Sequence, residues 1–94
     1  MQEKILTQHP QGKKGVNIST VKYHQVKDFI QQCLRDKGEM SFEELAGEAL
    51  RALQPVFDGK VLWYLVKVKL DLEARQLITR IPKSSPQKLR LVQK

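Results

Sequence analysis

The chain has 94 residues, of which 40% are apolar, so it suits one small domain near the size at which a core alone suffices. Its single cysteine, Cys33, excludes an intramolecular disulfide, and we therefore expect a reducing, cytoplasmic setting. The N-terminal residues lack the apolar run of a signal peptide, and no segment approaches the ~20 apolar residues of a membrane span. A soluble protein without a membrane partner is predicted.

The balance of charges favours anionic partners. The net charge is +7 and the pI is near 9.8, and nucleic acid is the commonest anionic partner of small basic domains. Residues 75–94 carry six basic side chains and no acidic one, whereas residues 39–58 carry five acids and only one base, Arg51. The charge is therefore polarised along the chain.

The first part of the chain is polar and contains turn residues. Residues 1–13, with Pro10 and Gly12, are expected to form a flexible or loosely docked N-terminal arm, and residues 14–94 a single domain. In residues 14–19, Val16 and Ile18 alternate with polar neighbours. This alternation predicts a short strand with one buried face.

A first helix is expected to follow this strand directly. Ser19 or Thr20 can cap its first turn, and the helix should run to about Lys37 and stop at Gly38. Its apolar positions recur at the three- and four-residue spacing of a buried face: Tyr23, Val26, Ile30, Cys33 and Leu34.

The start of a second helix is marked by two devices. Ser41 and Glu44 have the spacing of a capping box, and Met40 and Leu45 have that of a hydrophobic staple. Pro55 should end this helix after about twelve residues, since proline removes an amide donor. A short loop over residues 54–59 then leads to a third helix, as in a helix-turn-helix pair with a lengthened turn.

The third helix, residues 60–76, is predicted to be the structural axis of the domain because apolar residues cover two of its sides. One side gathers Leu62, Trp63, Val66, Leu70, Ala74 and Leu77, and the other gathers Val61, Leu65, Val68 and Leu72. We expect the first two helices to cover one side and the C-terminal sheet the other, with Trp63 in the core. Between the two sides runs a narrow polar stripe of Lys60, Tyr64, Lys67, Asp71 and Arg75.

After this helix the pattern alternates, which predicts two strands. Ile78 and Ile81 bound the first strand, Leu89 and Leu91 belong to the second, and residues 82–86 supply a proline-bounded turn. The predicted order is strand, helix, helix, helix, strand, strand. This is the order of a winged-helix-like α+β fold, in which the strand of residues 14–19 would join the final hairpin, or wing, as a third strand.

Three segments are similar to a known family: ILTQHPQGKKGVNIST, WYLVKVKLDLEARQLITRIP and SPQKLRL. They resemble a family of small bacterial proteins of unknown function, and the resemblance covers most of the chain. It implies a winged-helix-like fold and brings no activity, ligand or catalytic residue. The chain departs from the family pattern at Gln76, where glycine often precedes the first strand of the wing.

The residues needed for catalysis or for binding a cofactor are scarce. Metal binding requires several converging ligands, and only His9, His24 and Cys33 are available besides carboxylates. No nucleophile with a base and an orienting group is recognisable, and the glycines are scattered at turns rather than gathered in a phosphate-binding loop. We expect a protein that is not an enzyme and that has no cofactor and no small-molecule ligand.

DNA binding is the leading functional prediction, with a role that could be regulatory. A helix-turn-helix places its second helix in the major groove, and basic side chains fix the phosphate backbone. The residues expected to contact DNA are Lys60, Tyr64, Lys67 and Lys69 in the third helix, and Arg80, Lys83, Lys88 and Arg90 in the wing.

Three features oppose this prediction. Asp71 interrupts the polar stripe, and the second helix is acidic at Glu43, Glu44 and Glu48. The stripe also lacks asparagine and clustered arginine for reading base edges. The alternative is a module that binds another protein or a second copy of itself, since Trp63 and Tyr64 are residue types enriched at interfaces.

Overall fold

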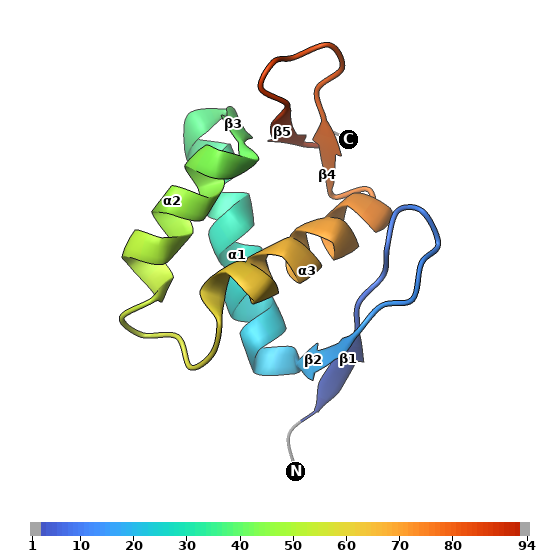
Figure 1. The fold of residues 1–94 in the computed structure, drawn as a ribbon, viewed down its shortest axis with the longest axis vertical. Coiled ribbons are helices and arrows are strands. Elements are labelled where there is room, and N and C mark those ends of the chain that lie inside the picture. Colours follow the sequence, from blue (N-terminus) through green and yellow to red (C-terminus); the bar gives the residue numbers. More distant parts are fainter. Residues whose placement is uncertain (1–2, 93–94) are drawn as a thin grey trace.

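The computed structural model describes residues 3–92, which combine three helices with two small antiparallel sheets (Figure 1). In chain order the elements are β1 (Lys4–Leu6), β2 (Asn17–Ser19), α1 (Thr20–Lys37), β3 (Glu39–Ser41), α2 (Phe42–Leu53), α3 (Val61–Ala74), β4 (Ile78–Arg80) and β5 (Lys88–Leu91). The predicted α+β class is confirmed, and the element order is compatible with a winged helix. Within residues 3–92, no helix has the length and apolar character that a bilayer crossing requires.

Hydrogen bonds at the caps explain where the first two helices begin and end. The Ser19 hydroxyl accepts from a first-turn amide of α1, and the N–H of Gly38, at φ 83°, donates to the Leu34 carbonyl oxygen at 2.8 Å. At α2 the predicted capping box is complete. The Ser41 hydroxyl accepts from the Glu44 N–H, and the Glu44 carboxylate accepts from the Ser41 N–H, each at 3.1 Å. The predicted starts of both helices are confirmed.

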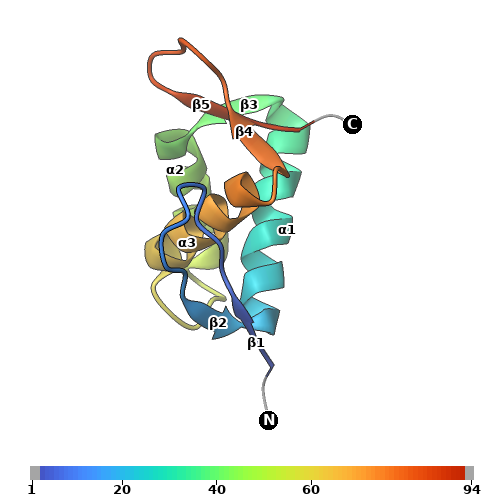
Figure 2. The same cartoon turned by 90° about the vertical axis from the view of Figure 1, so that its right-hand side faces the viewer.

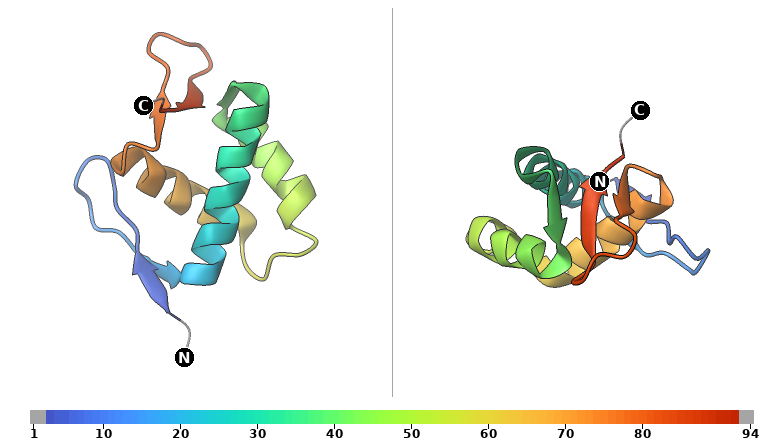
Figure 3. Two further views of the ribbon diagram at one scale, coloured as in Figure 1. Left: turned by 180° about the vertical axis from the view of Figure 1, so that it is seen from behind. Right: turned by 90° about the horizontal axis from the view of Figure 1, so that it is seen from above.

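The core lies where α3 crosses α1 and meets α2. Figures 1 and 3 show α3 lying across α1, with α2 beside them and the β4–β5 hairpin at one end of α1. The inner side of α3 is buried there, as predicted for Val61, Leu65, Val68 and Leu72. Buried partners from the rest of the chain are Ile18, Tyr23, Val26, Ile30, Leu34, Met40, Leu45, Ala49, Leu53, Phe57, Ile78 and Leu89.

The C-terminal hairpin forms as predicted, but its third strand comes from another part of the chain. β4 and β5 are antiparallel, with Ile78 opposite Leu91, and the third strand is β3, with Met40 opposite Leu89. The strand order is β3-β5-β4. The prediction that the strand of residues 14–19 completes this sheet is therefore wrong.

The length of α1 explains why β3, and not β2, pairs with the C-terminal hairpin. β2 leads directly into the first turn of α1, and the 18 residues of α1 span about 27 Å. The hairpin lies at the other end of the helix, out of reach of β2 (Figure 1). Gly38 reverses the chain at that far end, which places residues 39–41 beside β5.

The N-terminal segment packs on the domain through a sheet of its own. β2 pairs with β1, which lies within the expected arm, and Ile5 stands opposite Ile18. Beyond β1, the buried Thr7 and the half-buried Val16 form two hydrogen bonds: the Thr7 N–H donates to the Val16 carbonyl oxygen at 2.9 Å, and the Val16 N–H donates to the Thr7 hydroxyl at 3.0 Å. Gly15 is needed here, because a Cβ at this position would lie 1.7 Å from the Thr7 carbonyl oxygen. Residues 1 and 2 of the arm lie outside the described residues.

The turn at the end of α3 has a backbone conformation that favours glycine. The Gln76 N–H donates to the Glu73 carbonyl oxygen, and the Leu77 N–H donates to the Leu72 carbonyl oxygen. This pair of bonds is a Schellman motif, whose left-handed position is usually glycine. Gln76 occupies that position with φ of 62°. The chain turns into β4 here despite lacking the glycine.

Candidate interaction surface

One side of α3 remains open to solvent. Leu62 is 42% exposed and Trp63 is 41% exposed, while Val66 and Leu70 on the same side are half-buried. We call these four residues the α3 outer face. The expectations that Trp63 lies in the core and that α3 is covered from two directions are wrong.

The α3 outer face is open to solvent because the other elements pack on the opposite, inner side of α3. α1 and α2 cover its inner side, and the sheet sits beyond its C-terminal end rather than over the outer face (Figures 1 and 2). Residues 7–16 form a loop that flanks the outer face at Leu70. Within residues 3–92, Leu62 and Trp63 keep about two-fifths of their surface in water.

Aromatic and cationic contacts hold the Trp63 ring in place. The rings of Trp63 and Tyr64 meet edge to face with centroids 5.0 Å apart, and Tyr64 makes the same contact with Phe57. The Lys67 ammonium lies 5.9 Å from the Trp63 ring centroid, and the Lys22 ammonium lies 5.3 Å from that of Tyr64. Such contacts favour one rotamer. Trp63 is therefore a preorganised, exposed aromatic side chain.

Asp71 does not lie in an exposed stripe, contrary to expectation. Its side chain is completely buried and accepts hydrogen bonds from the Tyr23 hydroxyl, from the Gln8 N–H at 2.8 Å and from Arg75 Nε at 2.9 and 3.0 Å. Burial and the hydrogen bond to Asp71 raise the pKa of Tyr23 well above its ordinary range. The hydrogen bond to Asp71 also raises the pKa of Arg75. Asp71 thus joins the N-terminal segment, α1 and α3, and is not available to a partner.

Three of the eight residues predicted to contact DNA form ion pairs within the domain. Lys69 lies 3.3 Å from the Glu73 carboxylate, and Arg80 binds the same carboxylate through two nitrogens at 3.2 and 3.3 Å. Lys88 lies 3.4 Å from Glu39. Their charges are balanced locally, which weakens them as contacts for an external anion.

The other five predicted residues differ in exposure. Lys60, Lys83 and Arg90 are exposed, and within residues 3–92 they form no ion pair. Lys67 is half-buried beside Trp63, and Tyr64 is half-buried beneath Lys22. Lys83 adopts φ of 61° at the tip of the hairpin. The eight predicted residues therefore differ in how accessible their side chains are to a partner.

One further lysine, Lys14, lies beside the α3 outer face and was not predicted. Lys14 lines a shallow hollow together with Lys67 and Leu70, and Lys13 precedes it in the same loop. The adjacent lysines at residues 13 and 14 were visible in the sequence, but only the fold of residues 7–16 against α3 brings Lys14 beside Leu70.

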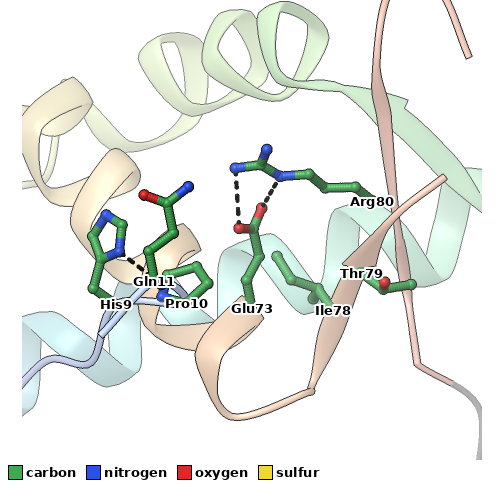
Figure 4. A pocket seen from close by; sticks show the side chains of 7 residues that line it. All are labelled: His9, Pro10, Gln11, Glu73, Ile78, Thr79 and Arg80. Carbon is green, nitrogen blue, oxygen red and sulfur yellow. Dashed lines mark hydrogen bonds and ion pairs between the residues drawn. The ribbon is translucent and has the colours of Figure 1, made fainter. Parts of the chain in front are cut away.

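A pocket of about 290 Å³ lies where the loop of residues 7–16 approaches the C-terminal end of α3 and β4 (Figure 4). His9, Gln11, Glu73, Thr79 and Arg80 line it together with Pro10 and Ile78. Glu73 is held by Lys69 and Arg80, and His9 Nδ1 accepts from the Gln11 N–H at 3.1 Å. The Glu73 carboxylate and His9 Nδ1 thus already form bonds within the domain.

The fold and this surface define a small α+β domain with an open apolar helix face beside a basic loop. The chain belongs to a family of unknown function, DUF6958, whose model matches residues 4–89. The family membership indicated by the three sequence segments is thereby confirmed. No curated protein and no solved structure matches the chain significantly.

Proposed function

We propose that this domain is a winged-helix-like module that binds a partner protein through the α3 outer face. The observation that carries the proposal is the exposure of Leu62 and Trp63 beside the half-buried Val66 and Leu70. In a winged helix the outer side of the third helix would face DNA. Here that side is apolar, so it suits a protein surface better than a charged phosphate backbone.

The residue types support the same conclusion. Tryptophan is enriched among the side chains that contribute most to protein interfaces, especially where apolar neighbours surround it. Covering the α3 outer face would remove apolar surface from water at a gain of about 25 cal/mol per Å². The aromatic contacts that fix Trp63 reduce the entropy lost when it is covered.

Nucleic-acid binding remains a second candidate because of one observation. Lys13, Lys14, Lys60 and Lys83 are exposed and form no ion pair within residues 3–92. The loops that carry them lie on the same side of the molecule as α3 (Figures 1 and 2). Such lysines favour salt-dependent contacts with phosphates that carry little sequence information.

Site-specific photo-crosslinking in the source cells tests the primary proposal. A photoreactive amino acid at Leu62 should give a discrete protein adduct, whereas the same group at Asp28, which is exposed on α1, should not. Adding Trp63→Ala to the Leu62 variant should abolish the adduct, because it removes the central anchor. Equal adducts at both positions, or none at Leu62, would refute the proposal.

A titration with duplex DNA at low and moderate salt tests the second candidate. Lys60→Glu/Lys67→Glu and Lys83→Glu/Arg90→Glu should each weaken binding if these residues contact phosphates. The absence of binding at low salt would reject nucleic acid as a ligand. Binding that neither double variant changes would reject these surfaces.

A further inference from the structure

We infer that the partner docks an amphipathic helix that is apolar on one side and acidic along its flanks. This inference rests on the proposed function, and it specifies the chemistry of the partner. The docking position is the α3 outer face, which the loop of residues 7–16 flanks at Leu70.

The spacing of the apolar residues fits a helix. From Leu62 to Leu70 the α3 outer face extends eight residues, which is about 12 Å or two helical turns. A helix that docks on such a surface presents apolar side chains at positions i, i+3 or i+4, and i+7. These positions span nearly the same length, so three anchors would reach all four residues of the α3 outer face.

The charges around the α3 outer face select an acidic partner. Lys14 and Lys67 share a hollow with Leu70, and Lys60 precedes the first turn of α3. Within residues 3–92, these three lysines have no acidic partner. Of the acids near α3, Glu73 is already neutralised by its ion pairs with Lys69 and Arg80, and the exposed Asp58, two residues before Lys60, offsets one of the three lysine charges. The flank is therefore net positive, and carboxylates on a docking helix would meet it favourably.

A second copy of the chain fits this surface less well. Val66 lies midway between Leu62 and Leu70, so a twofold axis through the α3 outer face would bring two Lys67 side chains together. Each copy would also bring a net charge of +7. The approach of the two Lys67 side chains and the net charge of the two copies are both repulsive, whereas the carboxylates of an acidic helix would attract the same lysines.

The single tryptophan of the chain provides a direct readout. Three 16-residue helical peptides serve as probes, with leucine at i, i+3, i+4 and i+7 in each and with glutamate, glutamine or lysine at the flanking positions. The glutamate peptide should shift the Trp63 emission to shorter wavelength in a saturable way. At low salt it should bind about tenfold more tightly than the glutamine peptide, and added salt should reduce the difference. The lysine peptide should not bind.

Variants test whether the glutamate peptide binds at the α3 outer face. The affinity of each variant is measured from the fluorescence anisotropy of a labelled glutamate peptide. Trp63→Ala should weaken binding about 30-fold, as expected for an interface anchor. Lys14→Glu/Lys67→Glu should weaken it about three- to tenfold, whereas the matched control Lys27→Glu/Lys37→Glu, on α1, should leave it unchanged. Thermal unfolding of each variant establishes that it is folded at the assay temperature.

Each outcome has a distinct meaning. Equal binding of the glutamate and glutamine peptides would overturn the acidic partner and leave the proposed function standing. Failure of all three peptides would overturn the helical partner, while the crosslink at Leu62 separately decides the proposed function. If duplex DNA displaces the glutamate peptide and shifts the Trp63 emission as much as the peptide does, nucleic acid occupies the α3 outer face. Both proposals are then refuted.

Discussion

Asp71 connects three parts of the chain that are distant in sequence, and Asp71→Ala should therefore be strongly destabilising. The substitution leaves the buried Tyr23 hydroxyl and the Gln8 N–H without their acceptor. An unsatisfied buried donor costs about 1–3 kcal/mol, and the Gln8 N–H takes the low end of this range because Gln8 is exposed and its hydrogen bond is only part-buried. The Arg75 side chain is 33% exposed and can be hydrated, so we assign no cost to it. The sum for the two donors is about 3 kcal/mol.

Urea and thermal unfolding measure this effect. A loss of about 3 kcal/mol should lower the midpoint of thermal unfolding by roughly 15 °C in a domain of this size. Asp28→Ala, at an exposed position of α1, is the control and should change stability by less than about 0.5 kcal/mol. In a double-mutant cycle, Tyr23→Phe should cost less in the Asp71→Ala background, because its partner is already absent. Equal effects of Asp71→Ala and Asp28→Ala would refute the role assigned to this cluster.

Three further predictions concern stability. Gln76→Gly should raise the free energy of unfolding by about 0.5–1 kcal/mol in urea titrations, because glycine adopts the left-handed conformation of Gln76 without steric cost; a loss of stability would contradict this. Gly15→Ala should lower it by about 2 kcal/mol, since the new Cβ would overlap the Thr7 carbonyl oxygen; unchanged stability would show that the loop adjusts freely. The raised pKa of Tyr23 stabilises the fold up to the ordinary tyrosine pKa of about 10, and this contribution is lost as pH rises toward the folded-state value. Stability should therefore fall above about pH 10, and Tyr23→Phe should flatten this fall; identical pH profiles would count against the assignment.

Local signals in the sequence were sufficient for the helices and the final hairpin. The capping box at Ser41, the stop at Gly38 and the alternation around Leu89 each depend on neighbours within a few residues. The strand β3 was not predicted because its three residues follow the end of α1 directly and include Ser41, the cap of α2, so that only Met40 marks a buried apolar position. Its pairing depends on β5, which lies about fifty residues further along the chain.

Whether a polar residue is buried or exposed was harder to predict, because its burial depends on partners that are distant in the sequence. Asp71 has four-residue spacing to Lys67 and Arg75, which is typical of a solvated helix face. Its burial requires Tyr23 and Gln8, which are 48 and 63 residues away. No local pattern contains those contacts.

The candidate surface was only partly predictable for a related reason. The apolar pattern placed Leu62, Trp63, Val66 and Leu70 on one side of the third helix, and the structure places all four there. Periodicity identifies a side of a helix but does not say what covers it. The sheet lies beyond the end of α3 and leaves this side open, so residues expected in the core became the α3 outer face.

The central claim is that the α3 outer face binds a protein rather than nucleic acid. The most direct measurement is the chemical nature of the adduct formed in cells by a photoreactive group at Leu62. We predict an adduct that protease digests, that nuclease leaves intact, and that Trp63→Ala removes. An adduct that nuclease digests, or one that persists in the Trp63→Ala variant, would contradict the claim.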